Sequence, residues 1–324
     1  MRVFVTGGNG FIGSSVLRQL CQRGHTVRCL LRPASNTERI ADLEFERFAG
    51  DVRDAAQVAA GVAGCQAVIH LASLSSWDLI DTPEMKDTVE QGTKNVLDAA
   101  RREKGLRVVY VSSATAVDGT NEPTVLDERS AYTLGGASGL TYSQYKHRAE
   151  EMCQAAFAEG VPVIIVNPAE TYGPKDTALI TAGTLVDFAK SSPVLVCKGG
   201  TSIVHVDDVA LGIVKAMETG KPGERYILGG DNLTLRELAE LALDLMGKKS
   251  RVMVIPNAMF RGVTKVATGL HIPLPYNPKV VPYATRYWFV DNSKAKRDLG
   301  VTFRSARDTL APTLSWLKEA GHIQ

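Results

Sequence analysis

The 324-residue chain has little of what marks a disulfide-stapled, membrane-spanning or nucleic-acid-binding protein. Its five cysteines are scattered without a Cys-x-x-Cys pair, which argues against a disulfide frame and a zinc site. No apolar run approaches the roughly 20 residues that cross a bilayer, and residues 2–6 are needed as a strand, so no signal peptide fits. A net charge of only +2 gives no electrostatic case for nucleic acid or an acidic membrane surface. We therefore expect a cytoplasmic protein whose partner is a small molecule.

Three glycines follow the first apolar segment of the chain, at positions Gly7, Gly10 and Gly13. Residues 2–5 read as a buried strand, and apolar residues recur at helical spacing from 11 to 20, so the glycines occupy a strand-to-helix turn. In such a turn the first glycine permits the tight bend, the second lets a pyrophosphate approach the backbone, and the third lets the helix pack closely on the sheet. The free N–H groups at the start of the helix attract negative charge. The pattern predicts a dinucleotide site.

Strand and helix patterns alternate through the first half of the chain. Nearly continuous apolar strands separated by helices are typical of a parallel sheet covered on both faces. We therefore expect a doubly wound α/β domain of the Rossmann type over residues 1–166. The predicted strands are 2–5, 26–31, 45–48, 67–71, 108–112 and 163–166, and the predicted helices are 11–23, 55–62, 84–102 and 142–159.

The pattern changes at residue 167, where prolines separate shorter elements. We expect residues 167–324 to form mainly a smaller, mostly helical lobe that binds the substrate, with parts of 196–228 returning to the first domain. The segment 196–206 is a candidate to rejoin the large sheet. The proline-rich stretch 271–282 is predicted to be a loop over the active site. The clearest elements are helices at 206–218 and 235–246, the latter with a capping box of Thr234 and Glu237, and a strand at 225–228.

The end of the second strand indicates which dinucleotide binds. An acidic residue there accepts hydrogen bonds from the ribose 2′-hydroxyl of NAD, whereas an arginine accommodates the 2′-phosphate of NADP. Leu31 occupies the acidic position and Arg32 follows it, which favours NADP over NAD. After the third strand, Asp51 and Val52 fit a contact to the adenine ring, with an ordinary turn aspartate as the alternative.

A tyrosine and a lysine four residues apart, Tyr142 and Lys146, lie on one face of a predicted helix. An ammonium close to a phenol favours the phenolate, so we expect the pKa of Tyr142 to fall below its usual value of about 10. Such a tyrosine gives a proton to a carbonyl oxygen or takes one from an alcohol. Ser113 closes the fifth strand at the edge where ligands bind, with Ser112 and Thr115 as alternatives for the hydroxyl that contacts the same oxygen.

The order of these motifs resembles that of the extended short-chain dehydrogenases/reductases, and within them the dihydroflavonol-reductase-like branch. The resemblance covers essentially the whole chain. It implies that Ser113, Tyr142 and Lys146 form the catalytic triad. It also implies a cofactor site that includes Phe11, Ile12, Leu71, Ala72, Ser73, Pro168 and Ala169. The matching segments are Thr6-Gly7-Gly8-Asn9-Gly10-Phe11-Ile12-Gly13, Asp51, His70-Leu-Ala-Ser73, Ser112-Ser113, Tyr142-x-x-x-Lys146, Asn167-Pro-Ala-Glu-Thr-Tyr-Gly-Pro174 and Val204-His-Val-Asp-Asp208.

One position departs from the family pattern, because Val89 stands where the family usually has asparagine. Valine offers no polar side-chain atom, so a proton relay behind Lys146 needs another route. His70 is expected to be a hydrogen-bonded core histidine, and no cluster of residues predicts a metal site. The candidates for the substrate pocket are Trp77, Ser113, Thr115, Glu170, Tyr172 and Tyr287.

Together these features predict an NADP(H)-dependent oxidoreductase that reduces a ketone or aldehyde to an alcohol. The lobe lacks an evident clamp for a sugar diphosphate, which favours an apolar or aromatic substrate. The alternatives are a nucleotide-sugar epimerase or dehydratase with tightly bound NAD, and a non-catalytic redox sensor of the same fold. The family resemblance suggests a homodimer through the helices at 84–102 and 142–159.

Overall fold

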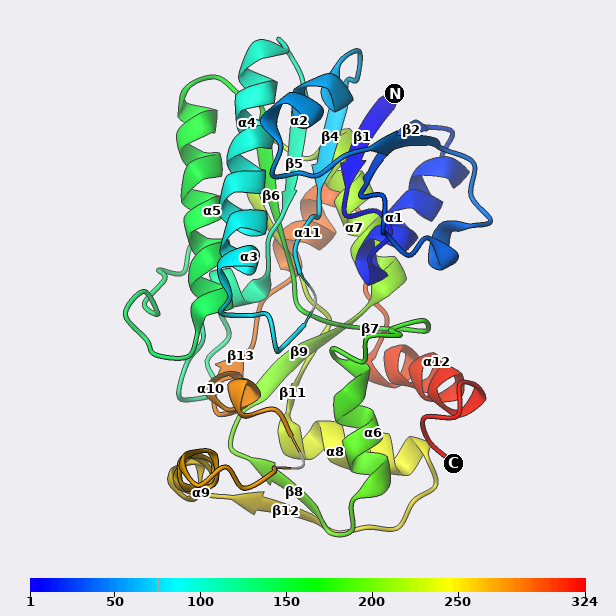
Figure 1. Cartoon of the computed structure of the whole chain (residues 1–324). Helices are drawn as coiled ribbons and strands as arrows, with labels where there is room; N and C mark the ends of the chain where they lie inside the picture. The colour runs from blue at the N-terminus through cyan, green and yellow to red at the C-terminus, as the bar shows by residue number, and fades with distance from the viewer. Residues whose placement is uncertain (75, 275) are drawn as a thin grey trace.

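Seven parallel strands form the central sheet of the computed structural model, which describes residues 1–74, 76–274 and 276–324 (Figure 1). The order across the sheet is β10-β6-β5-β4-β1-β2-β3, so the chain reverses its direction of winding between β1 and β4. This is the strand order of a doubly wound dinucleotide-binding fold, and it confirms the predicted fold class. The strands are β1 (Arg2–Thr6), β2 (Thr26–Leu31), β3 (Glu46–Ala49), β4 (Ala67–His70), β5 (Arg107–Val111), β6 (Val163–Pro168) and β10 (Arg225–Leu228).

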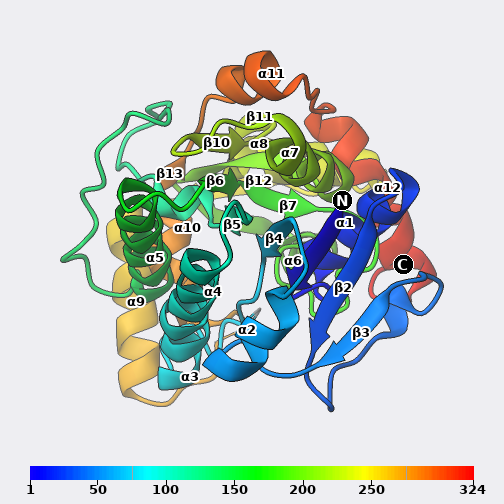
Figure 2. The same cartoon turned by 90° about the horizontal axis from the view of Figure 1, so that it is seen from above.

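Helices cover both faces of this sheet because successive strand side chains point to opposite sides. In β1, Val3 and Val5 belong to one apolar core, whereas Phe4 belongs to the other. Figure 2 shows the two helical layers on either side of the sheet. One layer contains α1 (Phe11–Gln22), α7 (Val206–Thr219) and α11 (Ser293–Leu299), and the other α2 (Ala55–Val62), α4 (Gly92–Arg102) and α5 (Thr141–Ala158).

The smaller lobe combines helices with two small sheets. The strand β9 pairs with β11, β13 and β7, and β8 pairs with β12. The prediction that 196–206 rejoins the large sheet is therefore wrong, since β9 spans most of that segment and is bonded within the lobe. By contrast, β10 does join the large sheet, beside β6. The lobe elements are β7 (Glu170–Tyr172), β8 (Val194–Cys197), β9 (Gly200–His205), β11 (Asp231–Thr234), β12 (Val252–Ile255), β13 (Tyr287–Trp288), α6 (Ala182–Lys190), α8 (Leu235–Leu245), α9 (Asn257–Gly269), α10 (Val281–Ala284) and α12 (Ala306–Glu319).

Local signals in the lobe match the structure closely. The capping box is formed, with the Thr234 side chain accepting from the backbone of Glu237 and the Glu237 carboxylate accepting from the backbone of Thr234. Of the predicted loop at 271–282, residues 271–274 and 276–277 are irregular and residues 278–280 form a short 3₁₀ turn, whereas its last two residues begin α10. Pro275, which is part of that predicted loop, lies outside the described residues.

A buried carboxylate ties α5 to the neighbouring strands. Glu150 is fully buried, pairs with Arg225 of β10, and accepts a hydrogen bond of 2.6 Å from Asn167 Nδ2 of β6. Burial raises the pKa of this carboxyl, while the Arg225 guanidinium acts in the opposite direction. Because α5 carries Tyr142 and Lys146, this network also holds the helix in place against the sheet.

Removing the Glu150 carboxylate is expected to destabilise the fold strongly. Glu150→Ala leaves a buried guanidinium and a buried amide without their acceptor, which costs about 3–5 kcal/mol in the free energy of unfolding. Urea unfolding followed by circular dichroism measures this change. Glu151→Ala is the matched control, since the Glu151 side chain is 62% exposed and its loss costs less than about 0.5 kcal/mol. Equal unfolding midpoints for the two variants would contradict the role given to Glu150.

Candidate active site

The glycine turn leaves no room for side chains where β1 meets α1. A Cβ on Gly7, whose φ is +73°, would lie 2.8 Å from the backbone nitrogen of Ala72, in the segment after β4. A Cβ on Gly13 would lie 2.1 Å from the carbonyl oxygen of Gly7. Within the described residues no side chain caps α1, and its first turn contains no acidic residue. The turn therefore presents free N–H groups and bare backbone, which fits the pyrophosphate of a dinucleotide.

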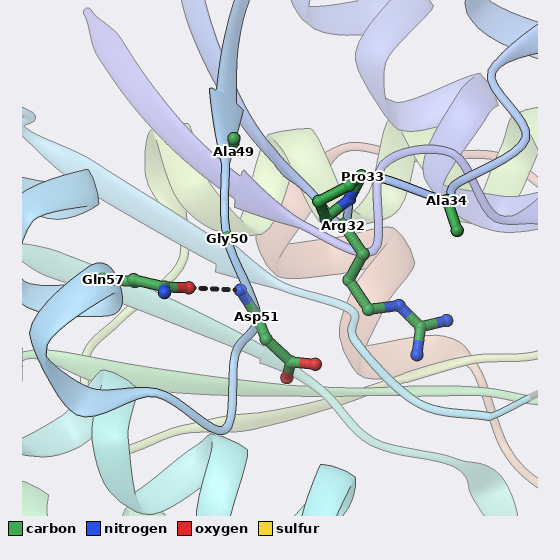
Figure 3. A pocket seen from close by; sticks show the side chains of 7 residues that line it. All are labelled: Arg32, Pro33, Ala34, Ala49, Gly50, Asp51 and Gln57. Atoms are coloured by element: carbon green, nitrogen blue, oxygen red, sulfur yellow. Dashed lines mark hydrogen bonds between the residues drawn. The ribbon is translucent and has the colours of Figure 1, made fainter.

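An open pocket extends from this turn across the carboxyl ends of β2 and β3. The part nearest the turn is lined by residues that include Gly7, Asn9 and Ser35. Arg32 and Asp51 belong to the linings of both parts of the pocket, and Figure 3 shows both side chains pointing to the same side of it. Asn9 and Ser35 had not been singled out from the sequence, although Asn9 lies inside the glycine motif. The pocket has the position that the adenosine half of a dinucleotide occupies in a fold of this kind.

The charges at this pocket form a small cluster of two arginines and two carboxylates. The Arg32 side chain is 54% exposed, and its Nη1 lies 3.9 Å from Glu84 Oε1. Arg53, which sequence reasoning missed, lies 2.7 Å from an Asp51 carboxylate oxygen and 3.8 Å from the same Glu84 oxygen. The hydrogen bond from Arg53 holds the pKa of Asp51 below its usual value. Only the folded chain shows that Arg53 and Arg32, which follow different strands, lie in one place.

The other predicted cofactor residues line up along the same carboxyl edge. Val52 and the segment Ala72–Ser73 contribute to the pocket wall, and the backbone of Leu71 bonds to Thr6 at 3.1 Å. Pro168 ends β6 and Ala169 follows it, on the far side of β5. Phe11 and Ile12 begin α1 directly after the glycine turn. All of these positions follow from parallel strands ending at one edge of the sheet.

Ser113, Tyr142 and Lys146 meet at this edge, where β5 ends against α5. The Ser113 side chain lies near the Tyr142 phenol and acts to lower its pKa. Thr115 donates to the Ser113 hydroxyl through its own hydroxyl, at 2.9 Å. Lys146 is buried, donates to the carbonyl oxygen of Val111 at 3.0 Å, and has its Nζ 6.0 Å from the centre of the Tyr142 ring. Ser112, the alternative to Ser113, is buried next to Glu150 instead.

The pKa of Tyr142 is shifted in the opposite direction to the sequence-based expectation. Burial raises the pKa of Tyr142 to about 12, although the nearby Ser113 side chain acts to lower it. Burial also lowers the pKa of Lys146 to about 8, although the nearby Glu150 carboxylate acts to raise it. The expected fall of the tyrosine pKa is therefore wrong for this structure, because desolvation of the phenol outweighs a lysine that lies beyond contact distance of its ring. Tyr142 is a protonated acid at neutral pH.

Behind the triad, the position that departs from the family pattern is apolar. Val89 is buried in an apolar core and lies in a π-helical turn at 87–91 that continues into α4. Its carbonyl oxygen accepts from the Thr93 hydroxyl, which also contacts His70 Nε2 at 3.2 Å. His70 is buried, bonded to Thr6 through its other nitrogen at 2.7 Å, and burial lowers its pKa to about 3. This confirms a neutral core histidine.

Aromatic and aliphatic side chains pack around the exposed side of Tyr142. The centres of the Trp77 and Tyr283 rings are 5.4 Å apart, and those of Tyr283 and Trp288 are 5.8 Å apart. Tyr283 had not been predicted, although it follows directly on the proline-rich loop expected over the site. This set, which we call the aromatic wall, consists of Trp77, Ile80, Tyr132, Leu134, Ala137, Leu140, Tyr283 and Trp288.

Of the six predicted substrate residues, only Trp77 belongs to the aromatic wall, and Glu170, Tyr172 and Tyr287 make their contacts elsewhere. Tyr172 is fully buried in the core of the smaller lobe, and its hydroxyl donates to Glu170 at 2.6 Å. Tyr287 precedes Trp288 on β13, so its side chain points to the opposite face and packs on Phe289. Trp77, Ser113 and Thr115 are the predicted substrate residues that the structure brings to the neighbourhood of Tyr142.

Comparison with known proteins agrees with this geometry. The model of the NAD dependent epimerase/dehydratase family matches residues 3–229. The chain is 30% identical to the 4-hydroxy-2-methyl-3-oxo-4-farnesyl-3,4-dihydroquinoline-1-oxide ketoreductase of Stigmatella aurantiaca, over 99% of this chain and 97% of that protein. It is also 30% identical to cinnamoyl-CoA reductase 2 of Medicago truncatula, over 99% and 92% of the two chains.

A solved structure, that of gox2253, is similar over 99% of both chains, with 31% identity and a TM-score of 0.84. The relatives are enzymes that act on small molecules, and their names are those of reductases, which supports an oxidoreductase. Of the helices in residues 1–74, 76–274 and 276–324, none has the length and apolar composition to cross a membrane. The chain belongs to the NAD dependent epimerase/dehydratase family, within the extended short-chain dehydrogenases/reductases, as its motifs predicted.

Proposed function

We propose that this protein is an NADPH-dependent reductase of apolar or aromatic ketones and aldehydes. One observation carries the proposal: Ser113 and Tyr142 meet at the carboxyl edge of the sheet, between the glycine turn and the aromatic wall. A carbonyl compound held there contacts two hydroxyl groups on its oxygen and apolar rings on its remaining surface. Dihydroflavonol-type and prenylated ketones have this combination of one polar oxygen and extended apolar area.

The preference for NADP over NAD rests on the charges at the end of β2. Leu31 is buried and offers no acceptor to a ribose 2′-hydroxyl, whereas Arg32 is half-exposed at the pocket. Arg53 is a second guanidinium nearby, since it lies close to the same Glu84 carboxylate as Arg32 and is held by Asp51. A 2′-phosphate suits this arrangement because guanidinium groups bind phosphate oxygens through paired N–H donors. Asp51 then faces the adenine.

The chain's own residues bind the carbonyl and supply the proton. When bound, the nicotinamide supplies the hydride that adds to the carbonyl carbon. The Ser113 and Tyr142 hydroxyls donate hydrogen bonds to the carbonyl oxygen, where negative charge develops as the C=O π bond breaks. Tyr142, protonated at neutral pH, transfers its proton to this oxygen and completes the alcohol. Lys146 provides a positive charge beside the phenolate that remains.

Loss of the Tyr142 hydroxyl is expected to remove most of the reductase activity. Tyr142→Phe keeps the ring in place but deletes the proton donor, and general acid catalysis contributes about 100- to 10,000-fold to rate. Steady-state NADPH consumption with a panel of aryl and prenyl ketones measures this effect. Tyr145→Phe is the matched control, since Tyr145 is on the same helix and its ring packs under Arg148 at 4.9 Å. Equal turnover by Tyr142→Phe and the native protein would overturn the mechanism.

Arg32 is expected to decide between the two dinucleotides. Arg32→Ala removes a charged donor to the 2′-phosphate, which weakens NADPH binding by about 10- to 100-fold and leaves NADH binding unchanged. Nicotinamide fluorescence titration gives both dissociation constants. Arg47→Ala serves as the control because Arg47 is exposed on β3 outside the pocket lining. Native protein that purifies with tightly bound NAD would instead favour an epimerase or dehydratase.

The pH dependence of kcat/KM for NADPH should follow the ionisation of the Lys146 ammonium group. Its pKa is lowered to about 8, so the ammonium form dominates below pH 8 and is lost as the pH rises through this value. We expect kcat/KM for NADPH, which reports groups of the free enzyme, to decline above pH 8. Lys146→Arg removes this decline because arginine stays charged. The pKa of Tyr142 is raised to about 12, so this tyrosine does not cause a decline near pH 8. The residual turnover of Tyr142→Phe should therefore show the same decline. A profile flat to pH 10 would exclude Lys146 as the titrating group.

A further inference from the structure

Most of the exposed large apolar side chains of this protein are gathered at one end of the smaller lobe. Of the eleven in the described part of the chain, eight lie on β8, on β12, on α9, at its C-cap Leu270 and at Ile272. Figure 1 shows these elements together, at the end of the lobe farthest from the seven-stranded sheet. Seven of these eight form the set that we call the apolar face: Leu195, Met253, Met259, Val263, Val266, Leu270 and Ile272. Val254 follows Met253 on β12, so its side chain points to the opposite side of the strand.

Helix α9 provides the largest continuous part of the apolar face. Met259, Val263, Val266 and Leu270 recur at helical spacing and form one stripe along it. The Val266 and Leu270 side chains are 61% and 66% exposed, so this stripe faces solvent. The helix is held to the lobe by a different face, on which Thr264 and Ala267 are buried. Since a helix usually buries its apolar stripe, the exposed stripe is available to another surface.

The two strands beside α9 extend the apolar face. Leu195 of β8 is directly opposite Met253 of β12 in the parallel pair, and both are exposed. The start of α9 is fixed to the end of β8, because the Asn257 side chain exchanges two hydrogen bonds of 2.8 Å with the backbone of Lys198. The helix and the strand pair therefore keep a set position relative to each other.

The chain segment from 245 to 290, which carries all of the apolar face except Leu195, is basic and contains no carboxylate. Between Asp244 and Asp291 there is no aspartate or glutamate, whereas seven lysines and arginines occur in that stretch. Four of them are exposed: Lys249, Arg251, Arg261 and Lys265. The net charge of +2 for the whole chain conceals this local excess.

We propose that the apolar face docks on the surface of an anionic lipid bilayer. An apolar stripe flanked by exposed lysines and arginines is the pattern of helices that lie in the membrane interface, where apolar side chains enter the acyl boundary and the cations contact lipid phosphates. Long basic side chains reach the phosphates while α9 lies at the boundary. Docking needs no membrane-spanning helix.

A second copy of this chain fits the apolar face less well. In a twofold dimer the same surface meets itself, so the lysines and arginines around α9 would face each other without a carboxylate from residues 245–290 to pair with. Like charges brought together in this way oppose association. An anionic bilayer supplies the missing opposite charge.

The apolar face connects to the proposed substrate site through packed residues. Arg261 of α9 donates to the Thr285 hydroxyl at 2.6 Å, directly after α10. Tyr283 of α10 is part of the aromatic wall, and its hydroxyl accepts from the backbone of Ser143 at 3.4 Å, next to Tyr142. A docked α9 thus places the aromatic wall close to the bilayer, where an apolar carbonyl compound would partition.

Vesicle flotation tests the proposal with the full-length protein. We expect the protein to float with vesicles of phosphatidylcholine and phosphatidylglycerol, to float much less with phosphatidylcholine alone, and to be released as salt is raised. The double variant Val263→Asp with Val266→Asp should lose vesicle binding. Replacing Lys249 and Arg251 by glutamine should weaken binding to the anionic vesicles by about five-fold for each charge removed.

The matched control is Val125→Asp, which places the same charge at an exposed valine outside the apolar face. It should bind vesicles like the native protein, and all variants should keep the native thermal midpoint by circular dichroism. Three outcomes overturn the proposal. The first is native protein that does not float with anionic vesicles. The second is a double variant that floats as well as the native protein. The third is native protein that is a dimer by light scattering and binds no vesicle, with a double variant that is a monomer, which would make the apolar face a self-interface.

Discussion

The contact between the glycine turn and the segment after β4 is the constraint on which the rest of the site depends. Gly7 lies so close to Ala72, and Gly13 so close to Gly7, that a Cβ at either glycine would overlap backbone atoms. This close approach brings the start of α1 to the point where the winding of the sheet reverses. Arg32, Asp51 and Ser113 follow other strands of the same parallel sheet, so their distances from the turn are set by strand spacing.

Burial determines the protonation states around Tyr142 more strongly than local pairing does. A lysine one helical turn away favours the phenolate, but enclosure by the aromatic wall favours the neutral phenol and prevails. The same desolvation lowers the pKa of Lys146 and leaves His70 neutral. Glu150 is the nearby charge that opposes the effect on Lys146, and it stays in place because Arg225 and Asn167 bond to it. In this state the Tyr142 phenol keeps its proton at neutral pH.

Much of the first domain could be predicted because its signals are local. The strand at 26–31 and the helix at 55–62 have the predicted bounds, and the three glycines lie at the predicted strand-to-helix turn. In the smaller lobe, the capping box at Thr234 is formed as predicted. The wrong predictions concern which distant segments a strand or side chain packs against. The segment 196–206 is a strand that pairs within the lobe, and Tyr172 is buried in the lobe core. An apolar strand or a tyrosine looks the same in sequence whichever neighbour it packs against, so tertiary contacts decide such cases.

The sequence by itself determined the fold class, the family and the place of the glycine turn between β1 and α1, because each depends on motifs and their spacing along the chain. Only the tertiary structure decided the direction in which the pKa of Tyr142 shifts, the proximity of Arg32 and Arg53 to one carboxylate, and the exposure of the apolar stripe on α9. Each of these depends on which distant segments exclude water from a side chain. Helical periodicity reveals that α9 has an apolar stripe, but whether that stripe is covered is a property of the folded chain.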